Sequence, residues 1–205
     1  MAAQKKSKVA QERDEGARGL WRWFLARLDV RRLVFVDESG FHIAMDRLRA
    51  RAPKGERAYG KVPRNRGKNL TLLASMSLHG IGETMCLEGS VDAQAFEVYV
   101  EHFLAPTLEE GQVVVLDNLK AHKSQRIREL IEARGAEVLF LPSYSPDLNP
   151  IEEAFSKIKA IVRKAGARTH EALLEAIAQA LSLMTVVDAA GWFSHSGYEV
   201  EVQYL

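Results

Sequence analysis

Gln112-Val-Val-Val-Leu-Asp-Asn118 is an apolar run of strand length that ends abruptly in a carboxylate. Its uninterrupted aliphatic residues predict a strand, Val113–Leu116, that is buried on both faces. The run Leu33-Val-Phe-Val-Asp37 has the same arrangement and predicts a second central strand. A buried carboxylate is costly unless it is paired or binds a cation. Two core strands that end in aspartate therefore indicate a site at their carboxyl ends.

A third acid follows a proline-rich loop, Leu141-Pro-Ser-Tyr-Ser-Pro-Asp-Leu-Asn-Pro-Ile-Glu152, and 34 residues separate it from Asp117 (152 − 117 − 1). The prolines and turn-forming side chains predict a fixed path rather than a flexible connection. Asn149 and Pro150 have the pattern of a helix N-cap and first helical residue, which places Glu152 at the capping-box position. Glu152 could serve the helix alone, but a rigid approach is what a metal ligand on a separate element requires. Three acids at the ends of core elements are suited to divalent cations.

Hydrophobic periodicity outside these motifs completes a pattern of strands and helices. Strands are predicted at 33–37, 70–78, 84–87, 113–116 and 137–141, and the glycine turn 79–82 joins the second to the third. Amphipathic helices are predicted at 20–28, 91–104 and 124–133, from 150 onwards and from 169 onwards, whereas 191–198 is aromatic without a pattern. The chain is therefore expected to be an α/β protein. Its mixed five-stranded sheet, flanked by helices, has the element order of a ribonuclease-H-like fold.

Length and composition fit one globular domain with short appendages, since the chain has 205 residues, of which 47% are hydrophobic and 27% charged. We expect residues 1–30 to form a tail and an amphipathic helix, residues 31–198 the ribonuclease-H-like domain, and residues 199–205 a C-terminal tail. The single cysteine, Cys86, excludes an intramolecular disulfide. No apolar run approaches the roughly 20 residues that span a membrane, so we expect a cytoplasmic protein with no membrane partner.

Positive charge gathers between residues 47 and 68, where nine lysines and arginines stand against one acid, Glu56, although the whole chain has a net charge of only +1. The candidate nucleic-acid contacts in this stretch are Arg47, Arg49, Arg64, Arg66 and Lys68. One interpretation is a solvated loop or edge hairpin, where basic residues prevent edge pairing. The other is a track for a phosphate backbone, which a neighbouring metal site would favour.

The loop after Asp117 gathers further polar side chains, namely Asn118, His122 and Lys123, at the carboxyl end of a strand. Open sheets place their sites at such ends. We expect His122 to contact substrate or orient a neighbour rather than bind metal, or else to be a loop residue that precedes the next helix. Asp37 has a simpler alternative as a turn residue at a strand end. Its neighbour Glu38 is expected to face the opposite side of the sheet.

Three segments together resemble the signature of the DDE transposases, and more narrowly the mariner-like superfamily and its bacterial insertion-sequence relatives. They are Val34-Phe-Val-Asp-Glu-Ser-Gly-Phe41, Val115-Leu-Asp-Asn-Leu-Lys-Ala-His-Lys-Ser124 and the loop 141–152. The loop is the most specific of the three, and the resemblance extends over residues 31 to about 198. It implies that Asp37, Asp117 and Glu152 form a metal-binding catalytic triad, with Asn149 among the supporting residues.

The resemblance also implies an activity, cofactors and partners. Two Mg²⁺ ions about 4 Å apart, replaceable by Mn²⁺, would support phosphoryl transfer by attack of water or of a 3′-hydroxyl. Double-stranded DNA at transposon ends and target sites would be the substrate, with a homodimer in the transposition complex and a nucleoid-associated location. Only some thirty residues precede Asp37, too few for the helix-turn-helix region that such enzymes carry, so a separate polypeptide or a frameshift product would supply it. A structure-selective nuclease of the same fold and an inactive DNA-binding remnant are the alternatives.

Overall fold

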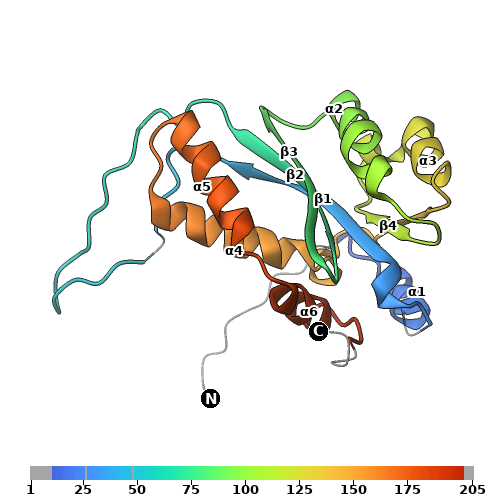
Figure 1. Cartoon of the computed structure of the whole chain (residues 1–205). Coiled ribbons are helices and arrows are strands. Elements are labelled where there is room, and N and C mark those ends of the chain that lie inside the picture. The colour runs from blue at the N-terminus through green and yellow to red at the C-terminus, as the bar shows by residue number, and fades with distance from the viewer. Residues whose placement is uncertain (1–10, 26, 48, 201–205) are drawn as a thin grey trace, which may run out of the picture.

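The structure of the chain, a computed structural model, describes residues 11–25, 27–47 and 49–200 (Figure 1). The strands are β1 (Leu33–Phe41), β2 (Leu70–Ser77), β3 (Gly80–Glu88), β4 (Val113–Leu116) and β5 (Glu137–Phe140). The helices are α1 (Glu15–Leu25), α2 (Ala93–Tyr99), α3 (Gln125–Glu132), α4 (Ile151–Ala165), α5 (His170–Ser182) and α6 (Val186–His195). The strands form one sheet in the order β3-β2-β1-β4-β5. The mixed five-stranded sheet predicted from the sequence is confirmed.

Strand register brings the first two acids together. β1 and β4 are parallel neighbours, and Val36 pairs with Leu116, so Asp37 and Asp117 follow directly after the last paired residues of the two strands. β4 ends there, whereas β1 continues to Phe41 because the antiparallel β2 still pairs with it. The prediction that the first strand ends at Asp37 is therefore wrong. Asp37 lies inside β1, at the point where its neighbour on one side stops.

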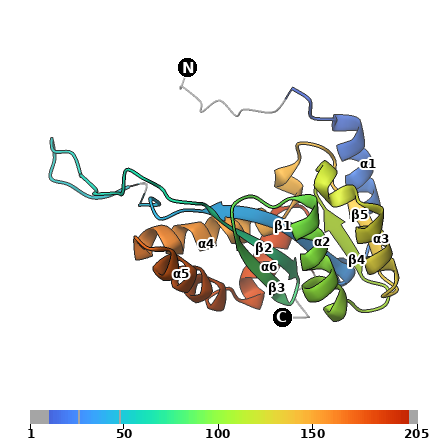
Figure 2. The same ribbon diagram turned by 90° about the horizontal axis from the view of Figure 1, so that it is seen from above.

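Helices cover both faces of the sheet (Figure 2), as the alternation of side chains along β1 requires. Leu33 and Phe35 belong to the core cluster that includes residues of α4, α5 and α6. Val34 and Val36 belong to the cluster on the other face, with residues of α2 and α3. Asp37 thus shares the α4 face, and the odd and even positions of one strand serve two separate cores.

The first helix differs from its prediction. It runs over Glu15–Leu25 instead of 20–28, and its buried residues are Arg18, Trp21 and Leu25. Leu20 is 71% exposed, so it does not belong to the buried stripe. The buried face includes Arg18, a charged residue that a search for hydrophobic periodicity counts as exposed. The N-terminal residues 1–10 and the last five, 201–205, fall outside the described part of the chain, as do the predictions that concern them.

Two other elements also differ from expectation. The helix predicted at 91–104 is α2 followed by a π-helical turn, Val100–Leu104, and a 3₁₀ turn at Ala105–Thr107 that contains Pro106. The segment 191–198, predicted to be unpatterned, mostly belongs to α6, which starts with a capping box between Thr185 and Asp188. The hairpin between β2 and β3 turns at Gly80, where φ is +108°, a value that glycine adopts without strain.

Within the described residues, no single helix is long and apolar enough to cross a membrane; α5 and α6 meet those criteria only as a pair bent by 83°.

Candidate active site

The three predicted acids line one cavity of about 350 Å³ at the carboxyl end of β4, beside the middle of β1. Its walls are Asp37, Asp117, Asn118, Leu119, Asn149, Glu152 and the loop residues 141–146. Residues 115 positions apart in the sequence (152 − 37) therefore line the same cavity. Parallel pairing places two of the acids, and the rigid loop delivers the third on the first turn of α4.

Asp37 is buried, with 8% of its surface exposed. One carboxylate oxygen accepts a hydrogen bond from the Glu38 amide at 2.8 Å, and the other accepts one from the side-chain amide of Asn149, also at 2.8 Å. Burial, followed by the negative charge of Glu38, Glu152 and Asp117, raises the pKa of Asp37 to about 8. The carboxylate is thus held in place by donors while its charge is opposed by its surroundings.

Asp117 is oriented by His122. Its Oδ1 accepts from the Leu119 amide at 3.0 Å and lies 2.5 Å from His122 Nδ1. His122 is 1% exposed, stacks on Phe96 with ring centroids 4.0 Å apart, and pairs through Nε2 with Glu38 Oε2 at 3.5 Å. Burial lowers its pKa, but hydrogen bonding to Asp117 and Glu38 outweighs this and raises the pKa to about 9. The predicted orienting role of His122 fits this geometry.

Glu38 is expected from the sequence to face away from Asp37 and to take no part in the site. It does face the α2 side, yet it joins the site indirectly, through the imidazole that bridges it to Asp117. No sequence signal singles it out except its place beside Asp37. Its side chain reaches the imidazole of His122, which belongs to the segment that follows β4.

Glu152 stands at the start of α4, whose inner face is Ile151, Ala154, Phe155, Ile158 and Val162, as the periodicity predicted. The predicted capping box is wrong: Pro150 occupies the N-cap, and no side chain caps the helix. Asn149 instead turns its amide to Asp37, because the loop brings it over β1. Partial burial raises the pKa of Glu152, Lys159 opposes this shift, and the charges of Asp117 and Glu38 add to it.

These electrostatics predict a pH dependence for the metal-free protein. The folded-state pKa values of Asp37 (about 8, against 3.8) and His122 (about 9, against 6.5) are both raised, so the folded state binds protons more tightly than the unfolded chain. Stability in EDTA should therefore fall as pH rises from about 4 to about 9. Melting temperatures across that range should show this fall, and Asp37→Asn should flatten its lower part. A wild-type stability that rises through pH 7 would contradict these assignments.

The loop 142–150 carries backbone strain beside the acids. Tyr144 has φ of +56°, unusual for an aromatic residue, and 58% of its surface is exposed at the cavity. Asn118 donates to Ser143 Oγ at 2.7 Å and so links this loop to the one that follows β4. A conformation of this kind persists only where its surroundings hold it, and such residues cluster at functional sites.

The remaining candidates lie away from the acids. Lys123 extends over the Phe140 ring at 5.6 Å and borders a different cavity. Arg47, Arg49, Arg64, Arg66 and Lys68 are exposed on an arm, residues 46–69, that projects from the end of β1 beyond α4 and α5 (Figures 1 and 2). Arg168, which the sequence pattern does not single out, holds the base of this arm through the carbonyls of Ile43 and Met45 at 3.1 and 2.9 Å.

The donor set fits divalent cations. It consists of carboxylates, with the buried Oδ1 of Asn149 lacking a partner among the described residues. Burial and mutual repulsion raise the pKa of Asp37 and Glu152, and a bound cation would relieve that repulsion. In the described part of the chain, no three His, Cys, Asp or Glu side chains already converge on one point. One oxygen of Asp37 accepts from Asn149 and Oδ1 of Asp117 lies against His122, and Asp37, Asp117 and Glu152 are the residues that would hold the ions.

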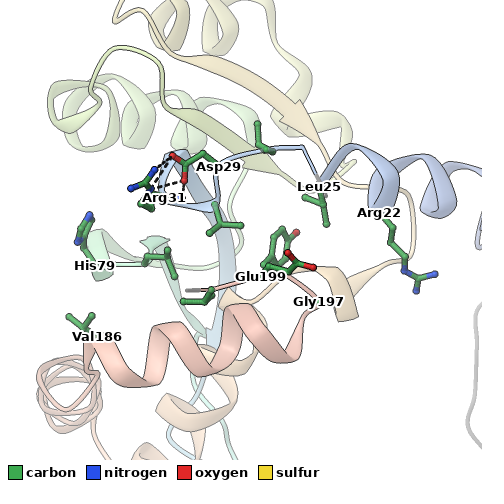
Figure 3. A pocket seen from close by; sticks show the side chains of 13 residues that line it. Arg22, Leu25, Asp29, Arg31, His79, Val186, Gly197 and Glu199 are labelled. Atoms are coloured by element: carbon green, nitrogen blue, oxygen red, sulfur yellow. Dashed lines mark hydrogen bonds and ion pairs between the residues drawn. The ribbon is translucent and has the colours of Figure 1, made fainter. Parts of the chain in front are cut away.

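A larger cavity, of about 550 Å³, lies elsewhere (Figure 3). It opens between α1, the turn after β2 and α6, near the start of β1, and none of the three acids lines it. Leu25, Leu28 and Tyr198 are among its lining residues, and the Asp29–Arg31 ion pair stands at its edge. Size alone therefore does not mark the reactive site of this fold.

Comparisons with known proteins agree with the geometry. A family described as "DDE superfamily endonuclease" matches residues 32–194. The Tcb2 transposase of Caenorhabditis briggsae is 29% identical over 169 residues, which make up 78% of this chain and 60% of that protein. The Mos1 strand transfer complex superposes with a TM-score of 0.72 at 20% identity, over 95% of this chain and 63% of that one. The Mos1 catalytic domain gives 0.61 at 14% identity, over 97% and 100%. These two likenesses show a shared ribonuclease-H-like fold, and the chain spans about 60% of its curated relative.

Proposed function

We propose that this chain, which belongs to the DDE superfamily endonucleases, is a transposase catalytic domain that cleaves DNA at transposon ends and joins them to target DNA. One observation carries the proposal: Asp37, Asp117 and Glu152, from two strands and a helix, line a single cavity. Transposition by the whole protein is part of the proposal, because the chain matches only 60% of its curated relative.

The cofactors of this reaction would be two Mg²⁺ ions, with Mn²⁺ as a substitute, held by Asp37, Asp117 and Glu152. Oxygen ligands suit Mg²⁺ better than Cys or His ligands do. Among the structures of similar fold, one is a Mos1 paired-end complex with Mg, and another is a Mos1 paired-end complex with Mn. When bound, the ions would activate the attacking oxygen and stabilise the leaving 3′-oxygen.

The protein's own groups keep the acids in place for this chemistry. Asn149 donates to Asp37 Oδ2, and His122 holds Asp117 from the opposite face of the sheet. The His122 imidazole is buried against Phe96 and cannot reach the cavity as a free base, so we assign it an orienting role. The attacking group is water in cleavage and a DNA 3′-hydroxyl in strand transfer, and no covalent protein intermediate is required.

Double-stranded DNA would be tracked by the basic arm. The arm follows β1, the strand that carries Asp37, and its cations are exposed. Two copies of the chain would hold two DNA ends, and the Mos1 transposase, which shares the fold, forms a paired-end complex with the left transposon end. A separate helix-turn-helix segment would recognise the terminal repeats, and the complex would act on the nucleoid.

Neutralising the arm should weaken DNA binding for all sequences alike. Arg64→Gln with Arg66→Gln should flatten the slope of log affinity against log salt by about 0.9 for each phosphate that the arm no longer neutralises. Fluorescence anisotropy with two unrelated duplexes measures this slope. The control is Arg126→Gln with Arg128→Gln, which removes two exposed cations of α3 on the far side of the sheet. If both double variants gave the same slope of log affinity against log salt, the arm would be interpreted as a solvated loop.

The proposed function is tested by offering the protein a duplex with a pre-cleaved 3′-hydroxyl end, a second duplex and Mg²⁺. A transposase joins the end to the second duplex, and sequencing gels detect the joined strand. Hydrolysis without joining would indicate a nuclease of the same fold. The absence of both reactions, with DNA still bound, would indicate an inactive remnant.

A further inference from the structure

The loop 142–150, called the catalytic loop below, is bound at three consecutive residues by three different parts of the fold. Asp147 is paired with Arg18 of α1, the Leu148 carbonyl accepts from the Tyr198 hydroxyl at 2.7 Å, and Asn149 donates to Asp37 of β1. Tyr198 follows α6, so both ends of the described chain hold the loop. Glu152 lies only three residues after Asn149, the last of the three contact residues, and its position depends on these contacts.

Arg18 is the unusual member of this set. It is fully buried, and its guanidinium binds both oxygens of Asp147 across 129 positions, at 2.9 and 2.6 Å. The two parallel hydrogen bonds fix the direction as well as the distance of the carboxylate. Hydrogen bonding to Arg18 accordingly lowers the pKa of Asp147. Glu15 and Arg13 extend the pair into a small surface network.

A structural role alone explains this arrangement poorly. Burying an arginine is costly, and an apolar residue of similar volume would often stabilise a core as well or better. Unlike an apolar residue, the guanidinium fork also fixes the orientation of the carboxylate that it binds. The strained Tyr144 supports this interpretation, since its left-handed backbone needs a loop that is held on both sides. Tyr198 supplies the second hold, packed edge-on against Phe35 of β1 at 5.3 Å.

We propose that Arg18 is a positioning residue of the reaction, which acts through Asp147 to hold the catalytic loop and so sets Glu152 against Asp37 and Asp117. This inference rests on the proposed function for the identity of the reaction. It makes α1 a part of the catalytic apparatus, although α1 contributes no residue to the three acids. Release of Arg18 would leave the acids present but poorly aligned.

The test compares Arg18→Met, which has an unbranched apolar side chain without the fork, with Arg18→Lys, which keeps the charge but has a single donor nitrogen. A hundredfold loss of kcat is the scale expected for a displacement of about 1 Å, with KM for DNA unchanged. Arg18→Met should show that loss together with weaker Mn²⁺ binding by calorimetry, and faster hydrogen exchange confined to residues 143–152. Arg18→Lys should recover part of each. Asp147→Asn, at a half-exposed position, repeats the test if Arg18→Met does not fold.

Leu173→Ala and Ile177→Val on α5 are the stability controls, since both residues are buried in the core and neither lines the cavity of the three acids. They should lower the melting temperature and leave kcat and Mn²⁺ affinity unchanged while the protein stays folded. Wild-type kcat and Mn²⁺ affinity in folded Arg18→Met, or in Asp147→Asn, would overturn the inference. A wild-type protein that binds Mn²⁺ but never cleaves DNA would instead refute the proposed function, and the Mn²⁺ and exchange measurements would still decide the role of Arg18.

Discussion

Asparagine at position 37 or 117 is expected to abolish Mg²⁺-dependent nicking of supercoiled DNA, by about a thousandfold or more. Each substitution removes a ligand charge, and several kcal/mol of transition-state stabilisation are lost with it. The fold should survive: the buried Asp37 carboxyl, with its pKa raised to about 8, is already unfavourable as an anion. Gel-based nicking and thermal melting measure the two quantities on the same samples.

Metal identity provides the control for that result. Mn²⁺ should replace Mg²⁺ in the wild-type protein, whereas Ca²⁺ should bind without supporting turnover because its looser geometry places the reacting groups poorly. Nicking that continues undiminished in excess EDTA would contradict the metal-dependent mechanism. So would full activity in either asparagine variant.

The second large effect separates two adjacent acids on α4. Glu152 lines the cavity with Asp37 and Asp117, whereas Glu153 lies about 100° further round the helix. Glu152→Gln should therefore eliminate cleavage, with little change in melting temperature, because α4 has no side-chain cap to lose. Glu153→Gln should leave activity within a few-fold of the wild type.

Glu153 is not merely a solvated residue, because it pairs with His195 on α6. His195 is mostly exposed, so an effect of the Glu153 substitution on stability should be small. Kinetic assays of both variants, with melting curves, decide the assignment. An inactive Glu153→Gln together with an active Glu152→Gln would show that the wrong acid has been assigned.

Much of the fold followed from local pattern. Apolar runs as continuous as Val113–Leu116 have few alternatives to a central strand, and an acid directly after such a run is conspicuous. The register that unites Asp37 with Asp117 depends on parallel pairing of β1 with β4, which the sequence pattern did not specify. The stripe of α4 was readable, since five buried positions recur at helical spacing.

Other features depend on tertiary contacts that no local pattern encodes. Asn149 has the sequence of an N-cap, yet its side chain reaches Asp37 instead, because the loop crosses β1 at that residue. Arg18 sits in a charged segment and has the pattern of a solvated residue, although its partner 129 positions away draws it into the core. The α6 helix escaped prediction because its small residues Ala189 and Ala190 give little periodic contrast, and packing against α4 decides their state.

Diffraction from crystals soaked in Mn²⁺ tests the central claim most directly, because anomalous scattering locates the ions independently of any activity. We predict two anomalous peaks in the cavity, both coordinated by carboxylate oxygens of Asp37, Asp117 and Glu152 and both lost in Asp117→Asn. Well-occupied Mn²⁺ bound elsewhere on the chain, with the three acids uncoordinated at saturating metal, would contradict the account.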